Sequence, residues 1–221
     1  MKLRDGLYWY RERGFFDANT FVIRDERTIL IDPGLDRYLR PRLLALQDDG
    51  IEPADIDLIA VTHLHPDHCG ATAALREVTG AKVALHPVQV EHFEAMDAGS
   101  RDALGVGIEQ RFSADLLLEE RLSLGCELEL DIVETPGHSP CGICFYAPAR
   151  KFLICGDLLF EQGVGRTDLP FGDTVALKAS IDRISRLNTE LLLPGHGEVL
   201  IGYERVQRNY EFVKRMFSAF F

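Results

Sequence analysis

Apolar residues fall into short runs along the chain, and most of these runs predict β-strands. Asn19–Ile23 and Thr28–Asp32 are rich in β-branched residues and flank a charged turn, so they predict a hairpin that ends at Pro33-Gly34. Further strand-like runs occupy residues 58–61, 127–135, 152–155 and 191–193.

Other stretches carry apolar residues at the spacing of a helix. Leucines predict a helix over residues 36–48, with Pro41 at an early position and Gly50 as its stop. The same spacing predicts helices over 174–187 and 203–217. Strands and helices alternate, which indicates an α/β class or closely mixed layers. No linker-like stretch interrupts the chain, so we expect a single domain over residues 1–221.

Composition and charge exclude several classes of protein. The 221 residues include 24 basic and 35 acidic ones, which gives a net charge of −11. Such a charge repels phosphate backbones and anionic lipids, so we expect no nucleic-acid partner and no membrane contact. No apolar run approaches the roughly 20 residues that span a bilayer. The first residues lack the apolar stretch of a secretory signal, so we expect a cytoplasmic location.

The five cysteines show no regular framework of spacings, so we expect reduced thiols rather than disulfides. Cys141 and Cys144 form a Cys-x-x-Cys pair, which is a candidate redox motif or half of a zinc site. No second pair completes four sulfur ligands. The pattern therefore favours ordinary packing of both thiols.

Four separate apolar runs each lead into residues of the types that bind metals. The carboxyl ends of neighbouring strands meet at one edge in layered α/β proteins, so these side chains are expected to converge. They are His63, His65, Asp67 and His68 after the run at 58–61, and His138, Asp157 and His196 after the later three runs.

Imidazole nitrogen and carboxylate oxygen are ligands that zinc and iron accept. Five imidazoles with two carboxylates are enough for two adjacent ions, with one carboxylate bridging them. Taken alone, Asp157 would fit a turn or a helix cap, and His138 or His196 an ordinary loop. The dense cluster over residues 63–68 favours metal by itself, whereas His86 and His92 lie outside the pattern.

The motif His63-x-His65-x-Asp67-His68, followed in order by Gly137-His138, Gly156-Asp157 and Gly195-His196, resembles that of the metallo-β-lactamase-fold hydrolases. Residues 163–170 resemble the glyoxalase II-like group (hydroxyacylglutathione hydrolases) and the related persulfide dioxygenases. The resemblance implies an αββα sandwich, with two mixed β-sheets and helices on both outer faces. It also implies a short form without the C-terminal helical domain of full-length glyoxalase II.

This resemblance also implies a role for each ligand. His63, His65 and His138 would bind one ion, Asp67, His68 and His196 would bind the other, and Asp157 would bridge them. Asp32 matches the aspartate that supports the metal-site loop in the family. The alternative for Asp32 is a plain Asp-Pro-Gly turn.

The expected function is that of a dinuclear metal-dependent hydrolase that cleaves a small acyl thioester such as a hydroxyacyl-glutathione. A divalent ion lowers the pKa of bound water to about 7, so a metal-bound hydroxide would be the nucleophile. Asp67 would orient this hydroxide. We expect two divalent ions, zinc in the first place, with iron or manganese as alternatives.

Arg166 stands where glyoxalase II enzymes carry a Lys or Arg that holds a carboxylate of glutathione, so the resemblance implies substrate binding. The alternative is an ion pair with Asp168 or Asp173 that fixes the loop.

Two other functions stay open. A persulfide dioxygenase would use a single iron held by the residues that match His63, His138 and Asp157. A metal-binding module without catalysis is the third interpretation. The predicted C-terminal helix carries the aromatic residues Tyr210, Phe212 and Phe217, and Phe220 and Phe221 follow it, so it would dock onto the domain's own sheet or form a homo-oligomer.

Overall fold

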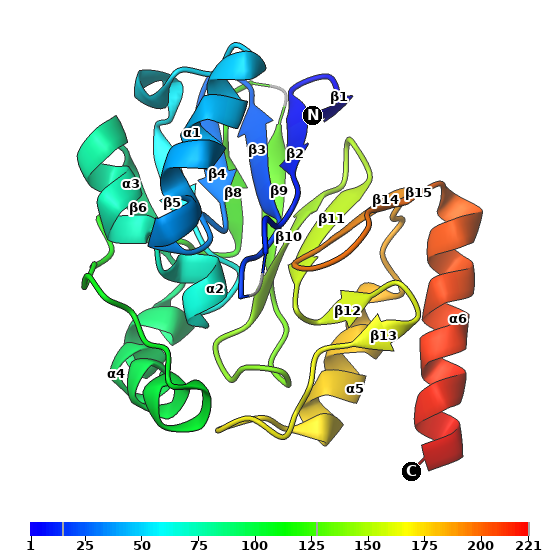
Figure 1. The fold of residues 1–221 in the computed structure, drawn as a ribbon. Coiled ribbons are helices and arrows are strands. Elements are labelled where there is room, and N and C mark those ends of the chain that lie inside the picture. Colours follow the sequence, from blue (N-terminus) through cyan, green and yellow to red (C-terminus); the bar gives the residue numbers. More distant parts are fainter. Residues whose placement is uncertain (15, 127, 221) are drawn as a thin grey trace.

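The computed structural model describes residues 1–14, 16–126 and 128–220, together with the side chains of these residues except 217–220. The described residues form two main β-sheets that pack face to face, with helices on both outer sides (Figure 1). The predicted αββα sandwich of the α/β class is therefore confirmed.

The first sheet comes from the N-terminal half of the chain. Strands β3 and β4 pair antiparallel, which confirms the predicted hairpin, and β4 to β7 run parallel to one another. From one edge to the other the sheet contains β1 (Lys2–Arg4), β2 (Leu7–Tyr10), β3 (Thr20–Arg24), β4 (Thr28–Ile31), β5 (Leu58–Ala60), β6 (Lys82–Leu85) and β7 (Leu116–Leu117).

The second sheet comes from the C-terminal half. Strand β10 pairs antiparallel with both β9 and β11, and β11 pairs parallel with β14. The order is β15 (Leu200–Ile201), β14 (Leu191–Pro194), β11 (Phe152–Gly156), β10 (Ile143–Ala147), β9 (Glu129–Glu134) and β8 (Arg121–Ser123). A short separate hairpin consists of β12 (Leu159–Phe160) and β13 (Gly163–Val164).

The helices flank these sheets. The predicted helix over 36–48 begins as the 3-10 turn η1 (Asp36–Tyr38) and continues as α1 (Leu39–Asp48). Helix α4 was not predicted, because buried Gln89, Asp97 and Ser100 interrupt its apolar face. The other elements are η2 (Pro53–Asp55), α2 (Pro66–Cys69), α3 (Thr72–Thr79), α4 (Pro87–Leu104), α5 (Thr174–Ile184) and α6 (Tyr203–Phe220).

Alternating residues of the strands fill different layers of the core. Phe21 and Ile31 point between the two sheets, where they meet Phe145 and Ile154 of the second sheet. Residues on the outer face of the first sheet pack against α1 and α3. Residues on the outer face of the second sheet pack against α5 and α6. Because both faces of each sheet are buried, the strands appear in the sequence as continuous apolar runs.

This topology places the candidate ligand segments at one rim. Strands β4 and β5 are parallel, so Asp32 and the segment after Ala60 leave the first sheet on the same side. In the second sheet β9 and β11 run in the same direction, since both are antiparallel to β10, and β14 follows β11. The segments that carry His138, Asp157 and His196 therefore leave the second sheet at one edge.

Helix α6 covers the second sheet through Val206, Tyr210 and Val213, which are buried. The side chains of Phe217 and Phe220, and the whole of Phe221, lie outside the described residues, so a homo-oligomer through this helix stays a prediction. No helix in the described part of the chain is long and apolar enough to cross a bilayer.

Candidate metal centre

The densest group of candidate ligands follows strand β5. His63 and His65 lie in the turn after the strand, and Pro66 occupies the first position of the one-turn helix α2. Proline suits this position because its fixed φ matches a helix and its missing N–H is not needed there. Helix α2 then carries Asp67 in its first turn and His68 in its last.

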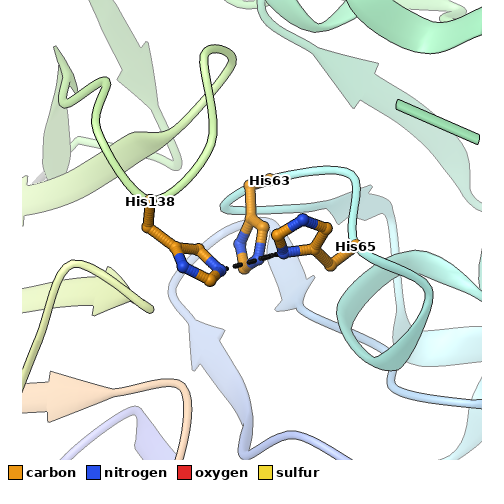
Figure 2. Close-up of side chains that lie close together, drawn as sticks. All are labelled: His63, His65 and His138. Carbon is orange, nitrogen blue, oxygen red and sulfur yellow. Dashed lines mark hydrogen bonds between the residues drawn. The ribbon is translucent and has the colours of Figure 1, made fainter. Parts of the chain in front are cut away.

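The first ligand group consists of His63, His65 and His138, whose side chains converge in Figure 2. The Nδ1 atom of His65 lies 3.0 Å from Nε2 of His63 and 2.9 Å from Nε2 of His138. All three side chains are buried. Three imidazole nitrogens therefore face one point, which is an arrangement that could hold a metal ion.

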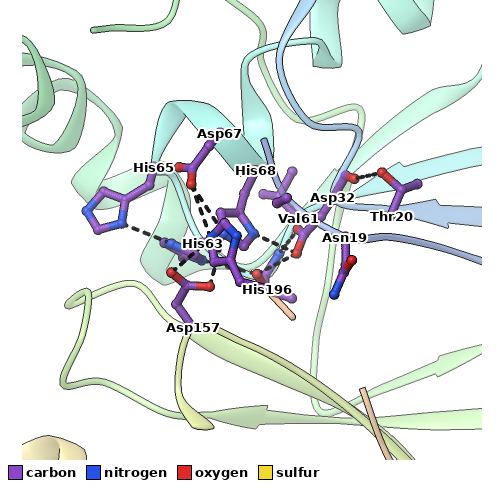
Figure 3. A network of polar contacts seen from close by, with 12 residues as sticks. Asn19, Thr20, Asp32, Val61, His63, His65, Asp67, His68, Asp157 and His196 are labelled. Carbon is purple, nitrogen blue, oxygen red and sulfur yellow. Dashed lines mark hydrogen bonds and ion pairs between the residues drawn. The ribbon is translucent and has the colours of Figure 1, made fainter. Parts of the chain in front are cut away.

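The second ligand group consists of Asp67, His68 and His196. Nε2 of His196 lies 3.3 Å from Oδ2 of Asp67, and Nε2 of His68 lies 3.9 Å from the same oxygen. Figure 3 shows these side chains beside those of His63 and His65.

Asp157 lies between the two groups. Its Oδ1 atom is 3.2 Å from Nε2 of His68, and its Oδ2 atom is 3.5 Å from Nε2 of His138 and 3.4 Å from Nε2 of His196. One carboxylate thus contacts histidines of both ligand groups, which is the geometry that a bridging ligand needs.

The outward-facing nitrogens of several rings have their own partners. Nδ1 of His138 donates to the backbone oxygen of Arg166 at 2.7 Å, and Nδ1 of His196 donates to Oε2 of Glu12 at 2.7 Å. Nδ1 of His68 lies 2.9 Å from Oδ2 of Asp32. A proton held on Nδ1 leaves the Nε2 lone pair directed into the site, as metal-binding histidines require.

The donor set fits divalent cations. Nε2 of His68 and Oδ1 of Asp157 are buried and have no hydrogen-bond partner, although they lie only 3.2 Å apart. Buried polar atoms without partners are costly, and a cation between Nε2 and Oδ1 would satisfy both atoms. His63, His65 and His138 would hold one ion, and Asp67, His68 and His196 the other, with Asp157 between them.

The two ligand groups differ in their electrostatics. Burial, and after it the neighbouring His138, lower the pKa of His65 to about 4. Burial also opposes protonation of His68, but Asp157, Asp32 and Asp67 outweigh it and raise the pKa of His68 to about 10. Burial thus favours neutral imidazoles at His63 and His65, whereas the second group lies in a negative field that favours a cation.

Asp32 ends strand β4 and is completely buried. Its backbone adopts a φ of 56°, in the left-handed region that few residues other than glycine occupy. Its Oδ1 atom accepts from the Thr62 amide at 2.7 Å, and its Oδ2 atom accepts from the Thr62 hydroxyl at 2.8 Å and contacts His68. This carboxylate therefore holds both ends of the turn that contains His63 and His65.

Arg166 forms an ion pair with Asp168, which is the alternative to substrate binding that the sequence left open. Its Nε and one terminal nitrogen each lie 2.7 Å from a carboxylate oxygen of Asp168, and both side chains are exposed. Asp173 instead caps helix α5 by accepting from the amides of Val175 and Ala176.

A cleft of about 320 Å³ opens beside the ligands. Arg166 lies at this cleft, together with His65, Asp67, His138, Asp157 and His196. Apolar side chains form the rest of its wall, namely Phe16, Leu104, Phe160, Val164 and Leu169. A substrate next to the ligands would therefore contact a largely apolar surface.

Sequence reasoning missed three residues that contact the site. Thr62 precedes His63 in the sequence, and its hydroxyl lies 3.1 Å from Nδ1 of that histidine. Asn19 donates from Nδ2 to the backbone oxygens of Pro194 and Gly197, at 3.0 Å each. Glu12 contacts His196. It lies in a charged segment of the sequence, and no pattern of residues there predicted a role at the site.

The two remaining histidines and the Cys-x-x-Cys pair are not among the candidate ligands. His86 caps helix α4, and Nδ1 of His92 lies 2.9 Å from the backbone oxygen of Val88 in the same helix. Cys141 and Cys144 are both buried, next to Ser139 and Thr135 respectively. The ligand groups found among the described residues contain no cysteine.

Comparison with known proteins agrees with this fold. The family model described as "Metallo-beta-lactamase superfamily" matches residues 13–196, which is more than half of the chain. The chain therefore belongs to the metallo-beta-lactamase superfamily.

Curated proteins with similar sequences indicate a metallo-hydrolase within this superfamily. "Probable metallo-hydrolase MJ0888" of Methanocaldococcus jannaschii is 33% identical and covers 83% of this chain and 89% of its own. The hydroxyacylglutathione hydrolase GloC of Haemophilus influenzae is 32% identical, over 86% and 91%. A hydroxyacylglutathione hydrolase of Albidiferax ferrireducens is 33% identical, but this chain spans only 59% of its length.

Solved structures show the same architecture. BLEG-1 B3 metallo-beta-lactamase has a TM-score of 0.79 and 29% identity, and the match covers 94% of this chain and 99% of that one. TTHA1623 in a di-iron-bound form has a TM-score of 0.74 and 34% identity, with coverage of 90% and 96%. The chain is thus a metallo-hydrolase of this superfamily with a candidate site for divalent metals.

Proposed function

We propose that this protein is a dinuclear metal-dependent hydrolase that cleaves a small acyl thioester, such as a hydroxyacyl-glutathione. One observation carries the proposal: Asp157 contacts histidines of two separate ligand groups, within 3.5 Å of each. In this proposal the ligands are His63, His65 and His138 for one ion and Asp67, His68 and His196 for the other, with Asp157 bridging.

Bound divalent ions would supply hydroxide at neutral pH and would polarise the carbonyl of the substrate. Zinc is our first choice, and the di-iron form of TTHA1623 supports iron as an alternative. Burial opposes ionisation of Asp67, but His68 and a hydrogen bond with His196 outweigh it and hold the pKa of Asp67 below its ordinary value. An ionised Asp67 can accept a hydrogen bond from the attacking water and so orient it.

A thioester suits the chemistry of the cleft. A free thiol has a pKa of about 8.5, so a thiolate leaves without a general acid. The apolar wall formed by Phe160, Leu169 and their neighbours accommodates a small acyl group. Arg166 lies at the same cleft, and we propose that its guanidinium binds a carboxylate of the thiol carrier when it is released from Asp168.

A combined measurement tests this function. Protein purified without added metal is analysed for bound ions and assayed for thiol release from a hydroxyacyl-glutathione and for oxygen uptake with glutathione persulfide. Two ions with thiol release and no oxygen uptake are expected. One iron with oxygen uptake would instead indicate a persulfide dioxygenase, and bound metal without either reaction would indicate a non-catalytic module.

A β-lactam belongs in the same assay panel. The likeness to BLEG-1 B3 metallo-beta-lactamase, at 29% identity over nearly the whole of both chains, favours it as a second carbonyl substrate. Hydrolysis of a β-lactam at a rate above that of the thioester would overturn the proposed preference.

A further inference from the structure

Glu12 contacts the candidate metal site from a distant part of the sequence. It lies in the segment that joins β2 to β3, and its Oε2 atom accepts from Nδ1 of His196 at 2.7 Å. Its Oε1 atom accepts from the amide of Gly197 at 3.2 Å. The Glu12 carboxylate therefore binds both the side chain and the backbone of the segment that carries His196.

The same two segments contact each other at further points. The backbone amide of Asn19 donates to the oxygen of Gly195 at 2.7 Å. The side chain of Asn19 accepts from the amide of Glu12 at 3.0 Å, so it also fixes the position of Glu12. Arg11 pairs with Glu198 at 2.6 Å on the exposed side. The β2–β3 segment thus holds the His196 segment in place from the opposite sheet.

The partners of the outward-facing nitrogens differ between the two ligand groups. In the first group, Nδ1 of His138 faces a backbone oxygen and Nδ1 of His63 faces the hydroxyl of Thr62, so both partners are neutral. In the second group, His68 faces Asp32 and His196 faces Glu12, so both partners are carboxylates. A carboxylate behind a ligating histidine fixes the ring and makes it a stronger ligand.

We infer that Glu12 is a positioning residue for the second ligand group: it accepts a hydrogen bond from Nδ1–H of His196, which holds the proton on Nδ1 and leaves Nε2 free to bind metal. The inference rests on the proposed ligand role of His196. Asp32 is completely buried behind His68, whereas the side chain of Glu12 is 27% exposed. Glu12 can therefore be replaced with little disturbance of the core, which makes the second site testable by itself.

The experiment compares wild type with Glu12→Ala, Glu12→Gln, His196→Ala and Glu198→Ala. The metal-free proteins are titrated with Co²⁺ against a chromophoric chelator, which gives two stepwise dissociation constants, and the visible spectrum of bound Co²⁺ is recorded at each step. Glu198→Ala is the matched control, because it removes the Arg11 pair from the same segment and leaves His196 untouched. Thermal unfolding of each metal-free protein shows whether it is folded.

For Glu12→Ala we expect one binding step to weaken by about 10–100-fold while the other changes less than about twofold. Glu12→Gln keeps an oxygen that accepts the hydrogen bond but loses the charge, so its effect is expected to be smaller. Glu198→Ala should match wild type, and His196→Ala should lose one of the two ions.

Two results would overturn the inference alone. Either Glu12→Ala and Glu12→Gln bind both ions as wild type does while His196→Ala loses one, or Glu12→Ala weakens both steps equally. Retention of both ions by His196→Ala would remove the proposed ligand set, and the inference with it.

Discussion

The Oδ2 atom of Asp32 lies 2.9 Å from Nδ1 of His68, and neither side chain is exposed to solvent. Asp32 comes from the end of β4, while His68 belongs to α2, so the contact joins two segments at the rim of the first sheet. The same carboxylate holds the Thr62 amide and hydroxyl. A single buried side chain therefore sets the orientation of a candidate ligand and of the turn before it.

Replacement of Asp32 tests this relationship. Asp32→Ala leaves the Thr62 amide and hydroxyl and Nδ1 of His68 without their partner, so we expect a loss of about 3 kcal/mol or more in the free energy of unfolding. Metal affinity should fall by about 10–100-fold, since the carboxylate no longer orients the ring. Urea unfolding and metal titration measure the two effects. Asp36→Ala, at an exposed position nearby, is the control and should change neither.

Removal of metal should stop the reaction and lower the melting temperature. An ion that binds only the folded chain stabilises it by about 2.7 kcal/mol at a concentration 100-fold above its Kd. For a chain of this size that corresponds to a shift of roughly 5–10 °C. Calorimetry before and after chelation, with Zn²⁺, Fe²⁺ or Mn²⁺ added back, checks this. Full thioester hydrolysis by the metal-free protein would contradict the proposed function.

The stability of the metal-free protein should depend on pH in a defined direction. The pKa of His68 is raised to about 10 in the folded chain, from 6.5 in the unfolded one, because three aspartates outweigh the effect of burial. The folded state then binds the proton more tightly, so this contribution to stability is complete below pH 6.5 and is lost as pH rises toward 10. Urea unfolding across this window measures it for wild type and for His68→Gln, which should lose this part of the pH dependence.

In the proposed ligand set, binding of metal to His68 displaces the same proton. Isothermal titration calorimetry in buffers of different ionisation enthalpy should therefore show proton release on metal binding near neutral pH. Uptake of protons would contradict this expectation.

Arg166 should distinguish substrates by charge. Arg166→Ala is expected to raise KM for a thioester whose thiol carries carboxylates, and to leave KM for a neutral thioester unchanged. Asp168→Asn removes the competing partner of the guanidinium, so it should lower KM for the anionic substrate. An equal effect of Arg166→Ala on both substrates would point to a role in loop structure only.

Thiol labelling tests the packing of the cysteines. Burial raises the pKa of Cys144 to about 12 and also raises that of Cys141, so neither thiol is expected to react quickly with an alkylating reagent. Cys69 and Cys155 are also buried, whereas Cys126 is exposed. Mass spectrometry of the native protein should show one rapid modification, and the denatured protein five. Rapid modification of Cys141 would contradict this packing.

Local patterns in the sequence determined the strands and the segments that follow them. The run over 58–61 leads into His63–His68 within a few residues, and short apolar runs likewise precede His138, Asp157 and His196. Such runs predict strands because a short strand with both faces buried is apolar at successive positions. Strands β9, β11 and β14 run in one direction within the second sheet, so the convergence of His138, Asp157 and His196 could also be expected. Their meeting with the segment after β5 depends on the packing of the two sheets.

Only the tertiary structure decided which distant residues stand behind the candidate ligands. Glu12 and His196 are 184 positions apart, and their contact depends on how one sheet packs against the other. Whether Arg166 binds a substrate or pairs with Asp168 likewise depends on the conformation of a loop. A periodic pattern records which face of an element is buried, but it carries no information about which element covers that face. The sequence therefore determined which types of candidate ligand follow the strands. The packing of the two sheets determined which distant residues form hydrogen bonds with these candidate ligands.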